Sequence, residues 1–183
     1  MLKKTCFILY KNHINTSSHF TLFINNTPIT QVTEAPILGI TIDENLTFKT
    51  YCSVIRRKLA SSVFIFSKIR HKIPLSSAWS LYHSLFKSHL AYCITIWGNT
   101  CDSFLHPLNV LHNKFLRTLL CVPRSTHVPT LYTKASALTL ANLYIFSIAI
   151  LIYKYFNLPA LLPPTLNSIF NPTSAIHSYS EER

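Results

Sequence analysis

Two adjacent acids, Asp43 and Glu44, form the first pair in this chain whose spacing suggests catalysis. Paired carboxylates can act as general acid and base, or hold a metal ion. Neighbouring residues at a strand end point to opposite faces, however, so these two cannot easily share one proton or one metal. Acids are also favoured at the N-terminus of a helix, and basic sequence with a helical pattern follows them. We therefore interpret the pair as a hinge between a strand and a helix.

Histidine, cysteine and glycine offer no better catalytic or metal site. His83 and His89 are six residues apart, as are His106 and His112, and this spacing does not place two ligands on one helical face. A nucleophile with its base would lack a placed acid, because Asp102 is the only acid between residues 45 and 180. The five cysteines show no CxxC spacing, so we expect reduced thiols. With only two glycines, no phosphate-binding loop can form, and the residues alone predict no enzyme.

The charge of the chain is the first strong signal for a binding function. Lys and Arg total 17 against 6 Asp and Glu, a formal net charge of +11. Soluble proteins normally mix both signs on their surfaces. The near absence of acids after residue 45 therefore predicts a polyanionic partner, either nucleic acid or an anionic membrane.

The basic residues of the first predicted helix lie in a row. Arg57 and Lys68 are eleven residues apart, three helical turns, and both lie opposite the apolar face of Ile55, Leu59 and Phe66. Such a row can follow a phosphate backbone, and the alternative is an ordinary solvated face. The predicted nucleic-acid contacts are Arg56, Arg57, Lys58, Lys68, Arg70 and Lys72.

The N-terminal part of the chain has the pattern of short strands. Residues 4–10 and 20–24 are rich in β-branched and aromatic types, and the stretch 25–28, "NNTP", predicts a turn. "PILGITID", residues 36–43, alternates as one half-buried strand that ends at Asp43. We expect a small antiparallel β unit.

Beyond Leu46 the pattern becomes helical. Pro74 should end the first helix, and Ser76 or Ser77 should cap the second, which Gly98 ends. The apolar stripe of the second helix is predicted to be Ala78, Leu81, Tyr82, Leu85, Tyr92 and Ile96. A third helix is expected over 102–120, with a core face of Leu108, Leu111, Phe115 and Leu119.

Two prolines, Pro123 and Pro129, bracket a stretch that we expect to be a basic loop, and a fourth helix should follow over 140–156. Within it, the apolar run 143–153 rises only about 16 Å as a helix, roughly half a bilayer core. We interpret it as a buried core helix and expect no transmembrane span.

Four segments in one order carry a resemblance to a known family. They are "KKTCFILYK" (3–11), "APILGITIDENLTFKTY" (35–51), "LYHSLFKSHLAYCITIWGN" (81–99) and "AIHSYS" (175–180). Together they resemble the C-terminal part of the reverse transcriptases of non-LTR (LINE-type) retrotransposons. The first segment resembles the one that follows the catalytic strand pair of the palm, the second the passage from palm to thumb, and the third a thumb segment.

The resemblance implies an α+β chain with three parts: a palm-remnant β unit over 1–45, a mainly helical thumb-like bundle over 46–157, and a Pro-rich extended tail over 158–183. It implies an RNA or DNA template–primer duplex as partner, gripped without regard to sequence. The family's metal-binding aspartates lie on earlier palm strands, and this sequence holds no Asp-Asp. We therefore expect a truncated polymerase, inactive alone, with no cofactor of its own, whose Mg²⁺, palm and fingers belong to a parent enzyme.

Two other interpretations remain open from the sequence. The chain could be a non-enzymatic basic protein that binds nucleic acid, or a peripheral membrane protein that uses its basic and apolar helices as an anchor. We expect no small-molecule ligand, and an intracellular location, with the nucleus as one candidate compartment.

Overall fold

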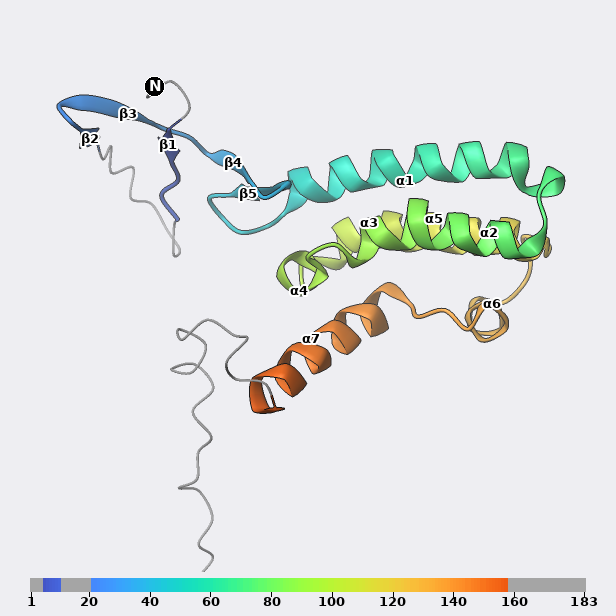
Figure 1. Ribbon diagram of the computed structural model, residues 1–183. Coiled ribbons are helices and arrows are strands. Elements are labelled where there is room, and N and C mark those ends of the chain that lie inside the picture. The colour runs from blue at the N-terminus through green and yellow to red at the C-terminus, as the bar shows by residue number, and fades with distance from the viewer. Residues whose placement is uncertain (1–4, 11–20, 158–183) are drawn as a thin grey trace, which may run out of the picture. The chain divides into compact units, whose positions relative to one another are not determined.

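The computed structural model describes residues 5–10 and 21–157, and the predicted tail 158–183, the segment 175–180 and Lys3–Lys4 lie outside the described residues. The chain divides into two compact units, Met1–Tyr144 and Ile145–Arg183. Short strands come first and helices follow, which confirms the predicted α+β class. Figure 1 shows this order along the chain.

The strands form two small sheets. β1 (Cys6–Phe7), β3 (Thr27–Gln31) and β2 (Leu22–Ile24) make a three-stranded sheet in that order, and β4 (Glu34–Ile37) pairs with β5 (Ile40–Asp43). The β2–β3 and β4–β5 pairs are antiparallel, as predicted. The β1–β3 pair is parallel, so the expectation of an all-antiparallel unit was wrong for β1, which pairs with the edge of β3 opposite to β2.

The segment 36–43 is a hairpin, so the prediction of one continuous strand was wrong. Leu38 and Gly39 both have positive φ, 49° and 83°, the backbone of a two-residue turn that reverses the chain. The reversal leaves Leu38 86% exposed, while Ile40 is 3% exposed. The predicted turn at "NNTP" is confirmed, since Asn25 and Asn26 have φ of 49° and 60° between β2 and β3.

Asp43 connects the last strand to the first helix, α1 (Lys49–Ile69). Its Oδ2 accepts hydrogen bonds from the backbone N–H and the hydroxyl of Thr47, both at 2.9 Å, and its Oδ1 accepts one from the N–H of Phe48 at 2.7 Å. Partial burial raises the pKa of Asp43, but these hydrogen bonds outweigh it and leave the pKa below its ordinary value. The hinge interpretation of the acid pair is confirmed.

The second helical region is broken where the sequence predicted one regular helix. After the 3₁₀ turn η2 (Arg70–Lys72), Pro74 occupies the N-cap position of α2 (Leu75–Leu81), so the expected capping by Ser76 or Ser77 was wrong. The π-helical segment η3 (Tyr82–Lys87) follows, then α3 (Ser88–Ala91) and α4 (Ile94–Trp97).

The π-helical turn also changes which residues are buried. Its i→i+5 hydrogen bonds shift the helical phase, so the predicted stripe holds at Ala78 and Tyr82 but fails beyond them. Leu85, Tyr92 and Ile96 are exposed. The buried residues of this stretch are Phe86, Leu90, Ile94 and Trp97.

The third predicted helix is confirmed as α5 (Asp102–Leu120), which runs alongside α1 in Figure 1. The Phe66 and Phe115 rings stack between the two helices with centroids 4.3 Å apart. The predicted basic loop is confirmed up to His127. A helix that the sequence did not predict, α6 (Val128–Ala135), begins at its end, because Pro129 lies in the first turn, where its missing N–H costs nothing.

The last helix, α7 (Leu140–Asn157), lies where the sequence predicted a fourth helix, but the expectation that it is a core helix was wrong. Only Leu140 and Leu143 are buried, whereas Phe146 and Tyr153 are among its exposed apolar side chains. By length and composition alone α7 could cross a membrane, which for a single helix is weak evidence. The predicted absence of a transmembrane span therefore stays a prediction.

Candidate nucleic-acid interface

The outward face of α1 carries the row of cations that the sequence predicted. Ile55, Leu59 and Phe66 are buried, and Arg57 and Lys68 are exposed on the opposite side of the helix. The burial predicted for this helix is thus confirmed, while the contact with nucleic acid stays a prediction.

Between the two ends of the row lies an aromatic ring. Phe64 is 64% exposed, and the Lys68 ammonium lies 5.4 Å from the centroid of its ring. A cation held over an exposed ring is positioned next to a flat apolar surface, and both features suit a nucleic acid, which offers phosphates and base or sugar faces.

The residues that flank the row differ in their surroundings. Arg56 and Lys58 are exposed on α1, and Lys72 is exposed in η2, beyond the end of the α-helix. Arg70 is half-buried, and its Nε donates a hydrogen bond to the carbonyl of Leu119 at 2.8 Å. Arg70 is therefore occupied within the fold, and the other five predicted residues remain available on the surface.

A basic groove beside α1 was missed by the sequence analysis. It has a volume of about 770 Å³ between the end of α1, α5 and the turn after α5. Its basic residues are His71, Lys114, Arg117 and Arg124, and no acid is among the described residues that line it. The spacing of Lys114 and Arg117, three residues apart on α5, was the available signal.

Within this basic groove, Arg117 has a structural role as well. Its Nη2 donates to the carbonyl of Thr126 at 3.1 Å and so holds the loop before α6. Its Nε is buried and has no hydrogen-bond partner in the described part of the chain. Lys114 and Arg124 are both exposed, and neither side chain makes a hydrogen bond or ion pair to a described residue.

The second and third segments that carry the family resemblance contact each other, and Thr100, just beyond the third, adds another contact. The Tyr92 hydroxyl donates to the carbonyl of Leu38, and the Thr100 hydroxyl donates to the carbonyl of Thr47, which closes the helical part against the hinge. The Tyr51 and Trp97 rings meet edge to face with centroids 5.8 Å apart. These contacts fix where α1 begins and hence where its basic face points.

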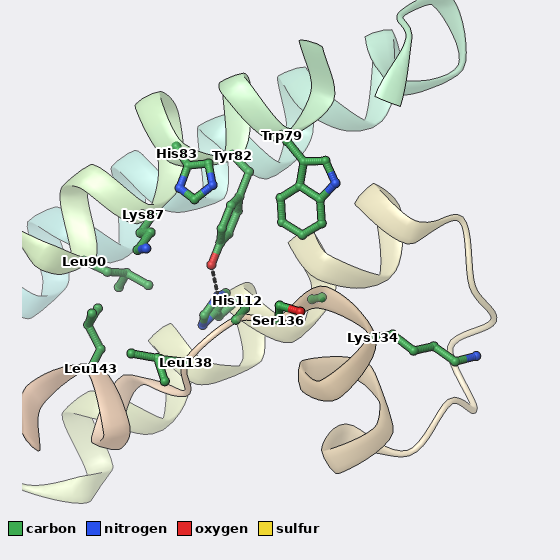
Figure 2. A pocket seen from close by; sticks show the side chains of 12 residues that line it. Trp79, Tyr82, His83, Lys87, Leu90, His112, Lys134, Ser136, Leu138 and Leu143 are labelled. Atoms are coloured by element: carbon green, nitrogen blue, oxygen red, sulfur yellow. Dashed lines mark hydrogen bonds between the residues drawn. The ribbon is translucent and has the colours of Figure 1, made fainter. Parts of the chain in front are cut away.

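A second cavity, drawn in Figure 2, lies away from α1. It has a volume of about 320 Å³ and is lined by residues of α2, η3, α3, α5 and α6, and by the start of α7. His112 forms its floor and is buried, with the Tyr82 hydroxyl 2.9 Å from Nε2 and the Tyr132 hydroxyl 3.1 Å from Nδ1. Burial, assisted by the charge of Lys87, lowers the pKa of His112 to about 4, so the imidazole is neutral.

Metal ligands do not gather in the structure. Among residues 5–10 and 21–157, no three His, Cys, Asp or Glu side chains lie together as a metal site would require. Asp43 is committed to Thr47 and Phe48, and His112 to two tyrosines. The described residues therefore do not fit the Mg²⁺ that a polymerase uses.

Comparison with known proteins gives a distant, partial relationship. The chain is 29% identical over 101 residues to a protein of Drosophila melanogaster named "Probable RNA-directed DNA polymerase from transposon X-element". The similarity covers 54% of this chain and 11% of the relative, so the chain spans a small part of that protein's length. No protein family and no solved structure matches the chain.

Proposed function

We propose that this chain binds the phosphate backbone of a nucleic-acid duplex, independently of sequence, as the thumb-like part of an RNA-directed DNA polymerase. The observation that carries the proposal is the acid-poor surface made by the α1 row and the basic groove. The distant similarity to a transposon RNA-directed DNA polymerase supports a template–primer duplex as the substrate of this surface.

The charges on this surface match what a backbone requires. Arg57 and Lys68 lie three helical turns apart, about 16 Å along the helix axis, a span that covers several phosphates of either strand. Lys114 and Arg124 add cations on the neighbouring helix and its following turn. Each cation that neutralises a phosphate releases a counterion, so affinity should fall steeply with salt.

Catalysis is not part of the proposed role. Nucleotidyl transfer by two metals needs carboxylates that converge on one point, and the described residues bring no such set together. We propose that the metal-binding palm, and the fingers, are supplied by a parent enzyme.

Binding to membranes is the alternative that one observation favours. The apolar side chains of α7 are largely exposed, and with the basic residues of the chain they could anchor it to an anionic bilayer. The two functions make different demands on the ligand, because a bilayer offers an apolar interior and a duplex does not.

The test compares the two ligands directly. Fluorescence anisotropy would measure binding of the chain to labelled RNA–DNA duplexes of several unrelated sequences, from low to high salt. Sedimentation would measure its binding to vesicles with one third anionic lipid. We expect duplex binding that weakens tenfold or more between about 50 and 200 mM salt, with similar affinity for each sequence. Binding to vesicles but not to duplex would overturn the proposal in favour of the membrane function.

A further inference from the structure

The cavity in Figure 2 has the size and lining of a site for a small molecule, which the sequence analysis did not expect. Its volume of about 320 Å³ falls at the lower end of the usual range for ligand pockets, about 300 to 1,000 Å³. Trp79, Leu90, Leu138 and Leu143 supply apolar walls. No residue of α1 lines the cavity, so it is separate from the proposed duplex surface.

The polar floor of the cavity has one more hydrogen-bond donor than it has hydrogen bonds. Neutral His112 carries one N–H, and Tyr82 and Tyr132 each carry one O–H, which makes three donors. Only two contacts join these groups, one at each ring nitrogen. In either tautomer one tyrosine accepts from the imidazole, and the proton of that tyrosine has no acceptor within the triad.

The position of the two tyrosines decides where that proton lies. If Tyr132 accepted from Nδ1–H, its own proton would be an unsatisfied buried donor, because Tyr132 does not line the cavity. If Tyr82 accepts from Nε2–H, its proton can point into the cavity that it lines. The second arrangement avoids the penalty, so the floor of the cavity offers a hydrogen-bond donor at the Tyr82 oxygen.

A cation lies at the side of the same floor. Lys87 lines the cavity from the same helical segment as Tyr82, and its charge contributes to the lowered pKa of His112. Lys134 also borders the cavity, but its side chain points away from it in Figure 2. No acid is among the lining residues, all of which belong to the described part of the chain.

We propose that this cavity binds an anion of the mononucleotide class, in which a planar base is joined to a phosphate, with Tyr82 donating to an acceptor on the base and Lys87 facing the phosphate. Trp79 and the leucine side chains contact the base. A base suits this lining because its flat face packs against apolar side chains and its ring carries hydrogen-bond acceptors for Tyr82. This site does not depend on the proposed duplex binding, since it uses neither α1 nor the basic groove.

The test uses the full chain and uridine 5′-monophosphate as probe, with uridine and ribose 5-phosphate as controls. Titration calorimetry gives affinity, and NMR follows the indole N–H of Trp79 and the ring of His112. We expect both resonances to shift with the nucleotide, uridine to bind about tenfold more weakly, and ribose 5-phosphate to leave Trp79 unchanged.

Matched variants locate the ligand in the cavity. Lys87→Gln should reduce nucleotide affinity to that of uridine, Tyr82→Phe should weaken both ligands, and Lys134→Gln should change neither. Tyr82→Phe removes a buried hydrogen bond. If this variant does not fold, the comparison of Lys87→Gln with Lys134→Gln tests the proposal. Unshifted Trp79 and His112 resonances at millimolar nucleotide, or equal losses in the two lysine variants, would overturn the proposal and leave a water-filled cavity.

Discussion

The Nε of Arg70 donates a hydrogen bond of 2.8 Å to the carbonyl of Leu119, which joins the end of α1 to the last turn of α5. The last carbonyls of a helix have no partner within it, and a cation there also interacts favourably with the helix dipole. Arg70 is therefore part of the contact between two helices, although in the sequence it stands among residues of the basic row.

Replacing Arg70 should therefore affect stability more than replacing its exposed neighbours. We expect Arg70→Gln to lower the free energy of unfolding by about 1.5 to 3 kcal/mol, the range for losing a hydrogen bond from a charged donor. Arg57→Gln, on the outward face, should change it by about 0.5 kcal/mol or less. Urea unfolding of the two variants makes the comparison, and equal values would show that the Arg70 contact contributes nothing in solution.

The row on α1 should be visible in the salt dependence of duplex binding. If Arg57 and Lys68 each neutralise one phosphate, replacing both with Gln should flatten the slope of log K against log salt by roughly 2. The change should be alike for unrelated duplexes, because phosphate contacts carry no base information. Anisotropy titrations at several salt concentrations provide the slope.

Leu59→Ala is the control for this double variant. Leu59 is fully buried, so its truncation should cost about 2 to 5 kcal/mol of stability and leave the salt slope of the folded protein unchanged. An unaltered slope in the double variant, with its helix content intact, would identify the α1 row as an ordinary solvated face.

The basic groove gives a separate prediction for α5. Lys114→Gln with Arg124→Gln should flatten the same slope by roughly 2 more, and the effect should add to that of the α1 variant, because each cation releases its own counterion. Lys134→Gln on α6, outside this groove, is the matched control. If the α1 variant changes the slope and this one does not, the duplex lies along α1 alone.

Sequence periodicity found the long helices because their packing obeys one period. Leu59 and Phe66 on α1, and Leu108 and Phe115 on α5, recur at helical spacing and are all buried. The prediction failed where the backbone changes its geometry. The π-helical turn shifted the buried positions to Phe86 and later residues. A pattern based on the regular 3.6-residue period of an α-helix cannot predict such a turn.

The candidate sites divide in the same way. The α1 row lies on one helix, so its spacing in the sequence was enough to place it. The basic groove joins His71 to Lys114 and Arg124, and the Tyr82–His112–Tyr132 cluster joins three helical segments. Which residues 20 to 53 positions apart come together depends on how the helices pack, and a single sequence does not contain that information.

The buried His112 makes stability depend on pH in a defined window. Its pKa in the folded chain is about 4, below the ordinary 6.5, chiefly because of burial. Above pH 6.5 the imidazole is neutral in both states, but between pH 6.5 and 4 the unfolded chain binds a proton that the folded chain does not. The free energy of unfolding should therefore fall as the pH falls, by about 3 kcal/mol in total across the window.

Urea unfolding between pH 7.5 and 4 measures this dependence, and His112→Leu should remove it. The variant will be less stable throughout because both tyrosine hydroxyls lose a partner, so the slope with pH is the decisive quantity. Asp43 contributes little to this slope, because its lowered pKa gives a stabilising effect that is present above its ordinary value of 3.8 and is lost mainly below it. A slope that persists in the variant would assign the effect to other groups.

The two glycines of the chain should respond differently to substitution, because they are required for different reasons. At Gly98 the backbone is ordinary, but a Cβ would lie 2.5 Å from the carbonyl oxygen of Ile94 and 2.7 Å from the Tyr144 ring. At Gly39 a Cβ meets only the Tyr92 ring at 3.9 Å, but φ is +83°. We expect Gly98→Ala to cost about 1 to 3 kcal/mol of stability through overpacking, and Gly39→Ala to cost about 1 to 2 kcal/mol through backbone strain.

Substitution with asparagine separates the two causes, since asparagine tolerates positive φ but is larger than alanine. Thermal and urea unfolding should show Gly39→Asn to be milder than Gly39→Ala, and Gly98→Asn to be worse than Gly98→Ala. The same order at both positions would mean that one of these two explanations is wrong.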